Sequence, residues 1–159
     1  MKYVMVGPPE SAPGLVPDTG QYLRAFAGVE EPQNAAVRAA VAVTGMYRTL
    51  YEARAAGNGD AVQPQVVDAL AFLIFGINRE VKAMLAEGPH PPPDAPEHPD
   101  TYGDEVASLA FRYFRVWWFQ SRKADISVEA NDLNLQIETV NALVADVRAG
   151  RVRLRLPDR

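Results

Sequence analysis

The sequence predicts a mainly helical bundle of four to five helices, with an extended N-terminal arm, a proline-rich strap and a short β-like C-terminal tail. Long segments with apolar residues at helical spacing predict the helices, and proline or glycine stands at their boundaries. The 159 residues are 48% hydrophobic and 23% charged, which is typical of a globular domain. We therefore expect one helical domain over residues 1–159.

Residues 1–18 are expected to form the extended arm, because four prolines and two glycines in GPPESAPGLVPD exclude a regular helix. Asp18 or Thr19 can then cap a short helix that ends at Gly28. The apolar stretch at the start of the arm has the composition of a strand.

Two long helices are expected next, over residues 34–57 and 64–87. Asn34 begins the first of them and Gly57 ends it, and Pro64 suits the first turn of the second. The second helix carries one narrow apolar stripe, which consists of Val66, Leu70, Leu73, Ile77, Val81 and Met84.

Residues 88–100 contain six prolines and are expected to form an extended strap between helices, with neither helix nor central strand. Two further helices are expected over residues 102–122 and 127–149. In the tail, residues 151–159, Arg alternates with Val or Leu at strand periodicity. Its expected partner is the apolar segment at residues 2–6.

The stretch FRYFRVWWFQSRK, residues 111–123, resembles an aromatic and basic mixture until it is placed on a helical wheel. Its cations then share one arc about 100° wide, and Phe119 is the aromatic residue inside that arc. Binders of single-stranded nucleic acid need both residue types on one face, so a packed helix is favoured. Trp117 and Trp118 point about 100° apart, so that either other helices of this chain or a second subunit must cover them.

Phe72 and Phe75 lie on the polar side of their helix, which suggests a contact surface unless another segment of this chain covers them. The terminal segments can pair with each other or add to a sheet of a neighbour. The interface candidates are Phe72, Phe75, Trp117, Trp118, Phe119, Tyr3, Val4, Met5, Arg151, Arg153 and Arg155.

Composition argues against several kinds of chemistry. The net charge of −4 disfavours a primary role in binding nucleic acid, and the absence of cysteine excludes thiolate chemistry. Both histidines lie in the strap, where His90, Asp94, Glu97, His98 and Asp100 are spaced too irregularly to favour a metal site over a solvated linker. We expect no cofactor, no metal and no catalytic residue.

Carboxylate catalysis stays open as an alternative. The acids that could take part are the pairs Glu30 with Glu31 and Asp132 with Glu138, although acids at helix starts and on solvated faces are ordinary.

The N-terminal apolar run is too short for a signal peptide, and the longest apolar run, residues 69–77, is about half a membrane span. We therefore expect a protein that is not secreted by a signal peptide, has no membrane partner, and is located in the cytoplasm or in a virion.

The leading hypothesis is a non-enzymatic structural subunit that assembles with other protein subunits, for example a phage head–tail connector or adaptor. The alternative is a helical regulatory or nucleoprotein-complex module that uses the arginine-rich tail. A third possibility is an enzyme with carboxylates in a helix-lined pocket.

Overall fold

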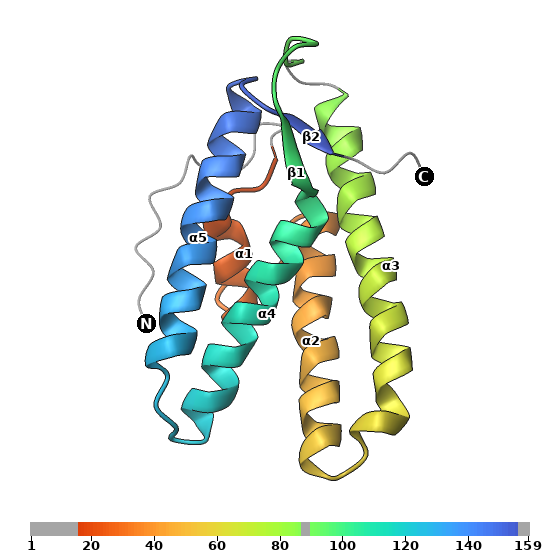
Figure 1. The fold of residues 1–159 in the computed structure, drawn as a ribbon, viewed down its shortest axis with the longest axis vertical. Coiled ribbons are helices and arrows are strands. Elements are labelled where there is room, and N and C mark those ends of the chain that lie inside the picture. Colours follow the sequence, from red (N-terminus) through yellow and green to blue (C-terminus); the bar gives the residue numbers. More distant parts are fainter. Residues whose placement is uncertain (1–15, 87–89, 156–159) are drawn as a thin grey trace.

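The computed structural model describes residues 16–86 and 90–155, which form a helical bundle with one small sheet (Figure 1). The mainly helical fold predicted from the sequence is therefore confirmed. The helices are α1 (Thr19–Phe26), α2 (Ala35–Ala55), α3 (Gly59–Leu85), α4 (Tyr102–Ser121) and α5 (Ser127–Arg148), and the strands are β1 (Glu97–Thr101) and β2 (Arg153–Arg155).

The first two helices begin at side chains that satisfy backbone N–H groups of the first turn. Asp18 accepts a hydrogen bond from the backbone of Gln21 at 2.9 Å, and Asn34 accepts one from the backbone of Val37 at 2.9 Å. Gly57 follows α2 with a φ of 81°, a conformation that favours glycine and stops the helix. Local sequence therefore sets these boundaries.

α4 is the central helix of the bundle. It contacts α2, α3 and α5, while α1 contacts α2, α4 and α5. The chain forms two antiparallel hairpins, α2 with α3 and α4 with α5, which Figure 1 shows side by side. Contact with three long helices explains the broad apolar arc of α4, whose buried residues include Val106, Leu109, Phe114 and Trp118.

A pair of buried tyrosines joins α1 to α4. Tyr22 and Tyr102 are fully buried, and their hydroxyl oxygens are 2.8 Å apart. The Tyr102 hydroxyl donates to the carbonyl of Pro17 at 3.3 Å, so the Tyr22 hydroxyl donates to Tyr102. Burial raises the pKa of both phenols above their ordinary value, and both therefore stay neutral inside the bundle.

α3 meets the start of α4 at a close backbone contact. The buried side chain of Asn78 accepts a hydrogen bond from the backbone N–H of Gly103 at 2.7 Å and donates to the hydroxyl of Thr101 at 3.2 Å. A Cβ atom at Gly103 would lie 2.7 Å from the carbonyl oxygen of Ile74. Glycine at this position therefore permits the approach of the two helices.

The strap and the tail pair with each other, a pairing that was not expected. β1 lies in the proline-rich segment, for which an extended chain without a central strand was expected, and β2 pairs with it in parallel, with Glu97 opposite Arg153. Pro99 is tolerated because both strands of a two-stranded sheet are edges and one side of each needs no donor. The segment at residues 2–6, expected to be the partner of the tail, lies outside the described residues.

α3 begins five residues before the expected start at Pro64. The backbone N–H of Ala61 donates to the carbonyl of Asn58 at 3.1 Å, which starts the helix at Gly59. Asp60 in the first turn interacts favourably with the helix dipole. Pro64 is therefore accommodated inside the helix rather than at its first turn.

Candidate functional site

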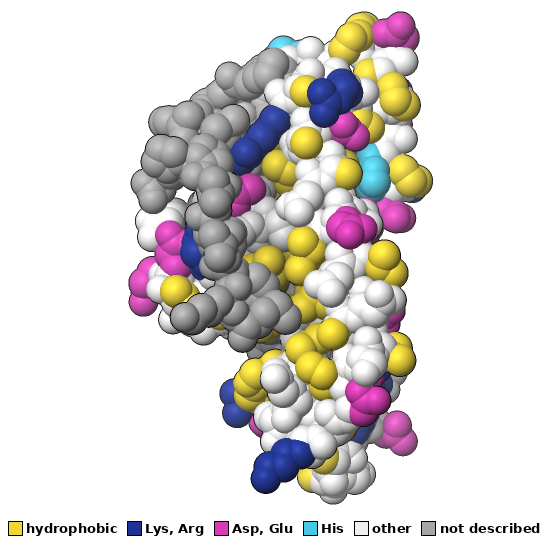
Figure 2. Space-filling model, turned by 90° about the vertical axis from the view of Figure 1, so that its left-hand side faces the viewer, with side chains coloured by type: hydrophobic (Ala, Val, Ile, Leu, Met, Phe, Trp, Pro, Cys, Tyr) yellow, Lys and Arg dark blue, Asp and Glu magenta, His cyan; other side chains and the backbone are white. Residues whose placement is uncertain are grey.

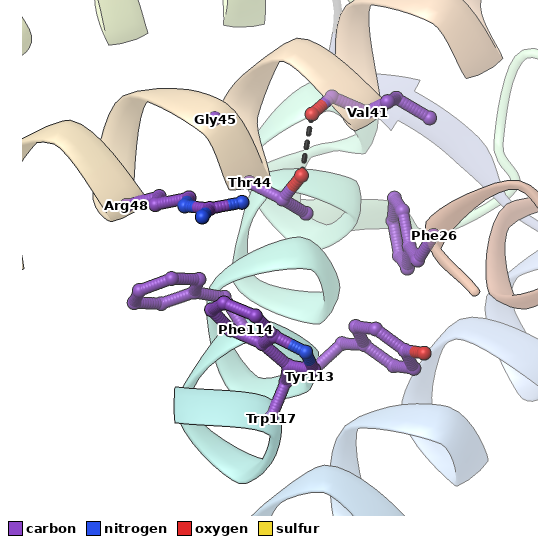
Figure 3. A pocket seen from close by; sticks show the side chains of 8 residues that line it. All are labelled: Phe26, Val41, Thr44, Gly45, Arg48, Tyr113, Phe114 and Trp117. Atoms are coloured by element: carbon purple, nitrogen blue, oxygen red, sulfur yellow. Dashed lines mark hydrogen bonds between the residues drawn. The ribbon is translucent and has the colours of Figure 1, made fainter. Parts of the chain in front are cut away.

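A groove lies between α2 and α4, with α1 at one end (Figure 3). We call it the aromatic groove, and its volume is about 370 Å³. Most of its wall is apolar or aromatic, as is usual for sites that bind an apolar group of a partner. The groove is lined by Phe26, Val41, Thr44, Gly45, Arg48, Tyr113, Phe114 and Trp117.

The polar groups of the aromatic groove have defined partners. The Thr44 hydroxyl donates to the carbonyl of Val41 at 2.6 Å, so it is satisfied within α2. Arg48 lies over the ring of Trp117 at 5.1 Å and also donates to Glu52 at 2.8 Å. Burial raises the pKa of the Tyr113 phenol, so its hydroxyl stays protonated.

Gly45 widens the groove on the α2 side, because a Cβ built there would have no heavy atom within 4 Å. The open space beside Arg48 and Trp117 has room for an inserted apolar or aromatic side chain.

The two tryptophans of α4 have different environments. Trp118 is 6% exposed and packs edge-on against Tyr51 of α2, with ring centroids 5.5 Å apart. Trp117 is 41% exposed and borders the aromatic groove. This chain thus covers Trp118, whereas Trp117 keeps a surface that a partner can contact.

The cations of α4 lie near Phe119, which the helical wheel placed inside their arc, and also near aromatic residues outside it. The guanidinium of Arg115 lies 5.6 Å from the ring centroid of Phe119 and 5.7 Å from that of Phe111, and Arg122 lies over Trp118. Long side chains reach beyond their own arc, which a wheel of Cα directions does not show. Arg115 also pairs with Glu129 of α5 at 3.6 Å, so this cation serves contacts within the bundle.

The second candidate surface is the outward face of α3. Phe72 is 76% exposed, while Phe75 is half-buried. Residues of the described part of the chain leave most of Phe72 accessible. α3 is the one helix among the described residues with the length and composition to cross a membrane, and 11% of its most apolar window is buried.

The α5 side of the molecule has a surface on which hydrophobic and charged side chains are mixed. Figure 2 shows hydrophobic side chains along the middle of this face with charged side chains of both signs around them. Val128 and Leu135 of α5 are exposed, two helical turns apart. They provide matched positions for control substitutions.

The arginines of the tail all have partners within the chain. Arg151 donates to Asp146 at 2.9 Å, and Arg153 donates to the carbonyl of Ala95 at 2.8 Å. Arg155 donates to the carbonyl of Pro99 at 3.3 Å. The contacts of Arg153 and Arg155 hold the tail against the strap, and that of Arg151 joins it to α5, which makes the arginines less available to phosphate groups.

One group of metal-ligating side chains does come together. His98 and Asp100 of β1 converge with Glu105 of α4, and their ligand atoms all lie within 4.8 Å of one another. One imidazole and two carboxylates can hold a divalent transition metal. The possible metal ligands considered from the sequence were all in the strap and did not include Glu105, which lies in the next helix.

The His98 cluster also has a role without a metal. His98 Nε2 lies 3.1 Å from Glu105 Oε2, and Gln136 of α5 donates to the backbone carbonyl of Glu105 at 3.0 Å. The cluster thus connects β1 to the first turn of α4, and α4 to α5. His90, Asp94 and Glu97 are outside it.

The carboxylates considered for catalysis lie at separate places. Glu30 pairs with Arg24 of α1, and Asp132 lies 4.0 Å from Arg112 of α4. None of these residues lines the aromatic groove. Tyr3, Val4 and Met5, named as interface candidates, lie outside the described residues.

The full chain matches no protein-family model, and it has no significant match among curated proteins or solved structures. Its function is therefore inferred from its own surfaces. The sequence predicted Phe72 and Trp117 as interface candidates but not the groove residues Gly45 and Arg48, because the groove arises where α2 crosses α4 and leaves no local sequence signal.

Proposed function

We propose that this protein is a non-enzymatic assembly subunit that joins other protein subunits through two surfaces. One is the outward face of α3, and the other is the aromatic groove between α2 and α4. The observation that carries the proposal is that one small bundle presents an exposed aromatic residue on each of two surfaces, Phe72 on α3 and Trp117 at the aromatic groove.

A phage head–tail connector or adaptor is one concrete form of such a subunit, because it contacts neighbours on more than one side. That form would be located in the virion, whereas other assembly subunits of this class would be cytoplasmic. The alternative function, a nucleoprotein module that uses the arginine-rich tail, is less favoured because Arg151, Arg153 and Arg155 already contact groups of this chain.

The proposal is tested by measuring the mass of the native complex that contains the tagged protein in extracts of its source cells. We expect a complex heavier than the 17.4 kDa chain. Phe72→Asp and Trp117→Ala should each release at least one component, because each removes an exposed aromatic anchor. Leu135→Asp, at a position 55% exposed on α5, is the control that should retain all components.

A chain that elutes as a monomer from the extract, or a complex that neither Phe72→Asp nor Trp117→Ala changes, would contradict the proposal. Release of a nucleic acid by mutation of the three tail arginines, with no effect of the two aromatic variants, would favour the nucleoprotein alternative.

A further inference from the structure

The outward face of α3 carries one continuous stripe of residues at alternating spacings of four and three. We call it the outer stripe. It lies opposite the apolar stripe that packs against α2 and α4, which includes the buried Val66, Ile77 and Val81. The outer stripe consists of Ala61, Gln65, Asp68, Phe72, Phe75, Arg79, Lys82 and Ala86, all exposed except the half-buried Phe75.

The outer stripe is complementary to the same stripe read in the opposite direction along the helix. Around a point between residues 73 and 74, Phe72 mirrors Phe75 and Asp68 mirrors Arg79. Further out, Gln65 mirrors Lys82, and the small residues at 61 and 86 mirror each other. In two antiparallel helices with this heptad spacing, residues at mirrored positions face each other across the seam.

We propose that α3 pairs with α3 of a second copy of this chain in an antiparallel, two-fold symmetric contact. The phenylalanines form its centre, where Phe72 of each copy packs against Phe75 of the partner copy. Asp68 of each copy then faces Arg79 of the other, and this gives two ion pairs, one on each side of the aromatic centre. The contact is isologous, so it closes at two copies.

The charges of the outer stripe favour a second copy of this chain over other partners. Among residues 16–86 and 90–155, neither Asp68 nor Arg79 forms an ion pair within the chain. The helix dipole alone favours acids early and cations late. It does not require that they lie equally far from the aromatic pair, as Asp68 and Arg79 do.

The length of α3 also fits. The mirror point lies near the middle of the helix, so the overlap runs from residue 61 to residue 86, about 39 Å at 1.5 Å per residue. A strip of this length and about 10 Å wide covers on the order of 400 Å² of each copy, below the ~800 Å² of a standard interface. We therefore expect a reversible dimer with a micromolar dissociation constant rather than an obligate one.

A membrane fits the same face less well. Asp68 and Arg79 interrupt the apolar part of α3, and the ten residues between them span roughly 15 Å, half the hydrocarbon thickness of a bilayer. The charged side chains that flank the aromatic centre of the outer stripe would be costly in lipid, whereas across an antiparallel pair they neutralise each other.

The charge arrangement is tested by sedimentation equilibrium from low micromolar to near-millimolar protein. Asp68→Arg and Arg79→Asp should each raise the dissociation constant by about tenfold or more, because each places like charges opposite one another. The double variant restores opposite charges in the reversed order, so its dissociation constant should return to within about threefold of the parent value. Arg38→Asp, an exposed charge reversal on α2, is the control.

The register is tested by cross-linking, for which the absence of native cysteine is an advantage. A mixture of Gln65→Cys and Lys82→Cys chains should form a disulfide between the two variants. Each variant alone should cross-link poorly, because residue 65 of one copy lies about 25 Å, or seventeen residues, from residue 65 of the other. Circular dichroism confirms that each variant is folded.

This inference rests on the proposed function, yet the two can fail separately. A parent chain that stays monomeric, a double variant that is not restored, or Gln65→Cys chains that cross-link with one another would each overturn the antiparallel pairing. Binding of the parent to vesicles of mixed neutral and anionic phospholipids, lost on Phe72→Asp, would overturn it in favour of a membrane. A native complex that contains other proteins would still support the assembly function.

Discussion

Gly103 shows how one residue without a side chain determines where two helices meet. The first turn of α4 lies so close to α3 that a Cβ at Gly103 would lie 2.7 Å from the carbonyl of Ile74 and 2.9 Å from Oδ1 of Asn78. The first of these atoms belongs to the backbone of α3 and cannot rotate away. The hydrogen bond from Gly103 to Asn78 depends on the same close approach.

Gly103→Ala should therefore lower the free energy of unfolding by about 1–2 kcal/mol, because the strain of overpacking exceeds the higher helix propensity of alanine. Gly45→Ala is the matched control, since a Cβ at Gly45 has open space around it. The control should be neutral or stabilising by up to about 1 kcal/mol. Denaturant unfolding at one fixed protein concentration measures both changes, and equal effects would contradict the close-contact explanation.

For single residues, the sequence predicts well on which face of its helix a side chain lies, and predicts poorly which residues of other helices that side chain contacts. The helical periodicity of α3 was sufficient to place Phe72 on the outward face, because that placement depends on the helix alone. Which of Trp117 and Trp118 is covered depends on where Tyr51 and Arg48 of α2 lie. No property of the α4 sequence contains that information.

Among the elements, helix boundaries were predicted where a cap lies next to the helix, as Asp18 and Asn34 show. The strand pair was predicted only in part. Alternation of Arg with apolar residues identified the tail as strand-like, but its pairing with the strap was not predicted. Pairing of distant segments depends on the packing of the helices between them. Pro99 and its neighbouring prolines also argued against a strand in the strap, so β1 was not predicted.

The contribution of β2 can be measured by shortening the chain. A chain that ends after Gly150 loses the hydrogen bond from the Arg153 backbone to Pro96 and the packing of Val152 and Leu154 on the core. We expect a loss of about 1–3 kcal/mol in the free energy of unfolding, since two partly buried apolar side chains are removed. A chain that ends after Arg155 keeps β2 and should lose much less; equal losses would contradict a stabilising role for the strand.

For the whole molecule, the buried tyrosine pair connects the first helix to the central one and determines how stability depends on alkaline pH. The pKa of Tyr22 and of Tyr102 is raised above the ordinary value of 10.0, chiefly because burial disfavours the charged phenolate. A phenol with a raised pKa in the folded state retains a proton that the unfolded chain releases. Stability from this pair is thus fully present below about pH 10 and falls as the pH rises further.

We expect cooperative unfolding of the bundle on alkaline titration, measured by circular dichroism. The double variant Tyr22→Phe with Tyr102→Phe lacks both buried phenols, so its unfolding transition should move to higher pH. Tyr47 and Tyr113, whose pKa values burial also raises, should retain part of the effect in that variant. An identical alkaline transition in parent and double variant would show that the buried pair does not control it.

The central position of α4 also has consequences for the order of folding. The α2–α3 and α4–α5 hairpins are local in sequence, so each can form without closing a long loop. The contacts that complete the bundle span much longer stretches of chain: Tyr22 and Tyr102 are 80 residues apart, and Arg148 donates to the carbonyl of Val16 across 132 residues. We therefore expect the hairpins to form early, and the docking of α1 on α4 and α5 to be the slow step that completes the native state.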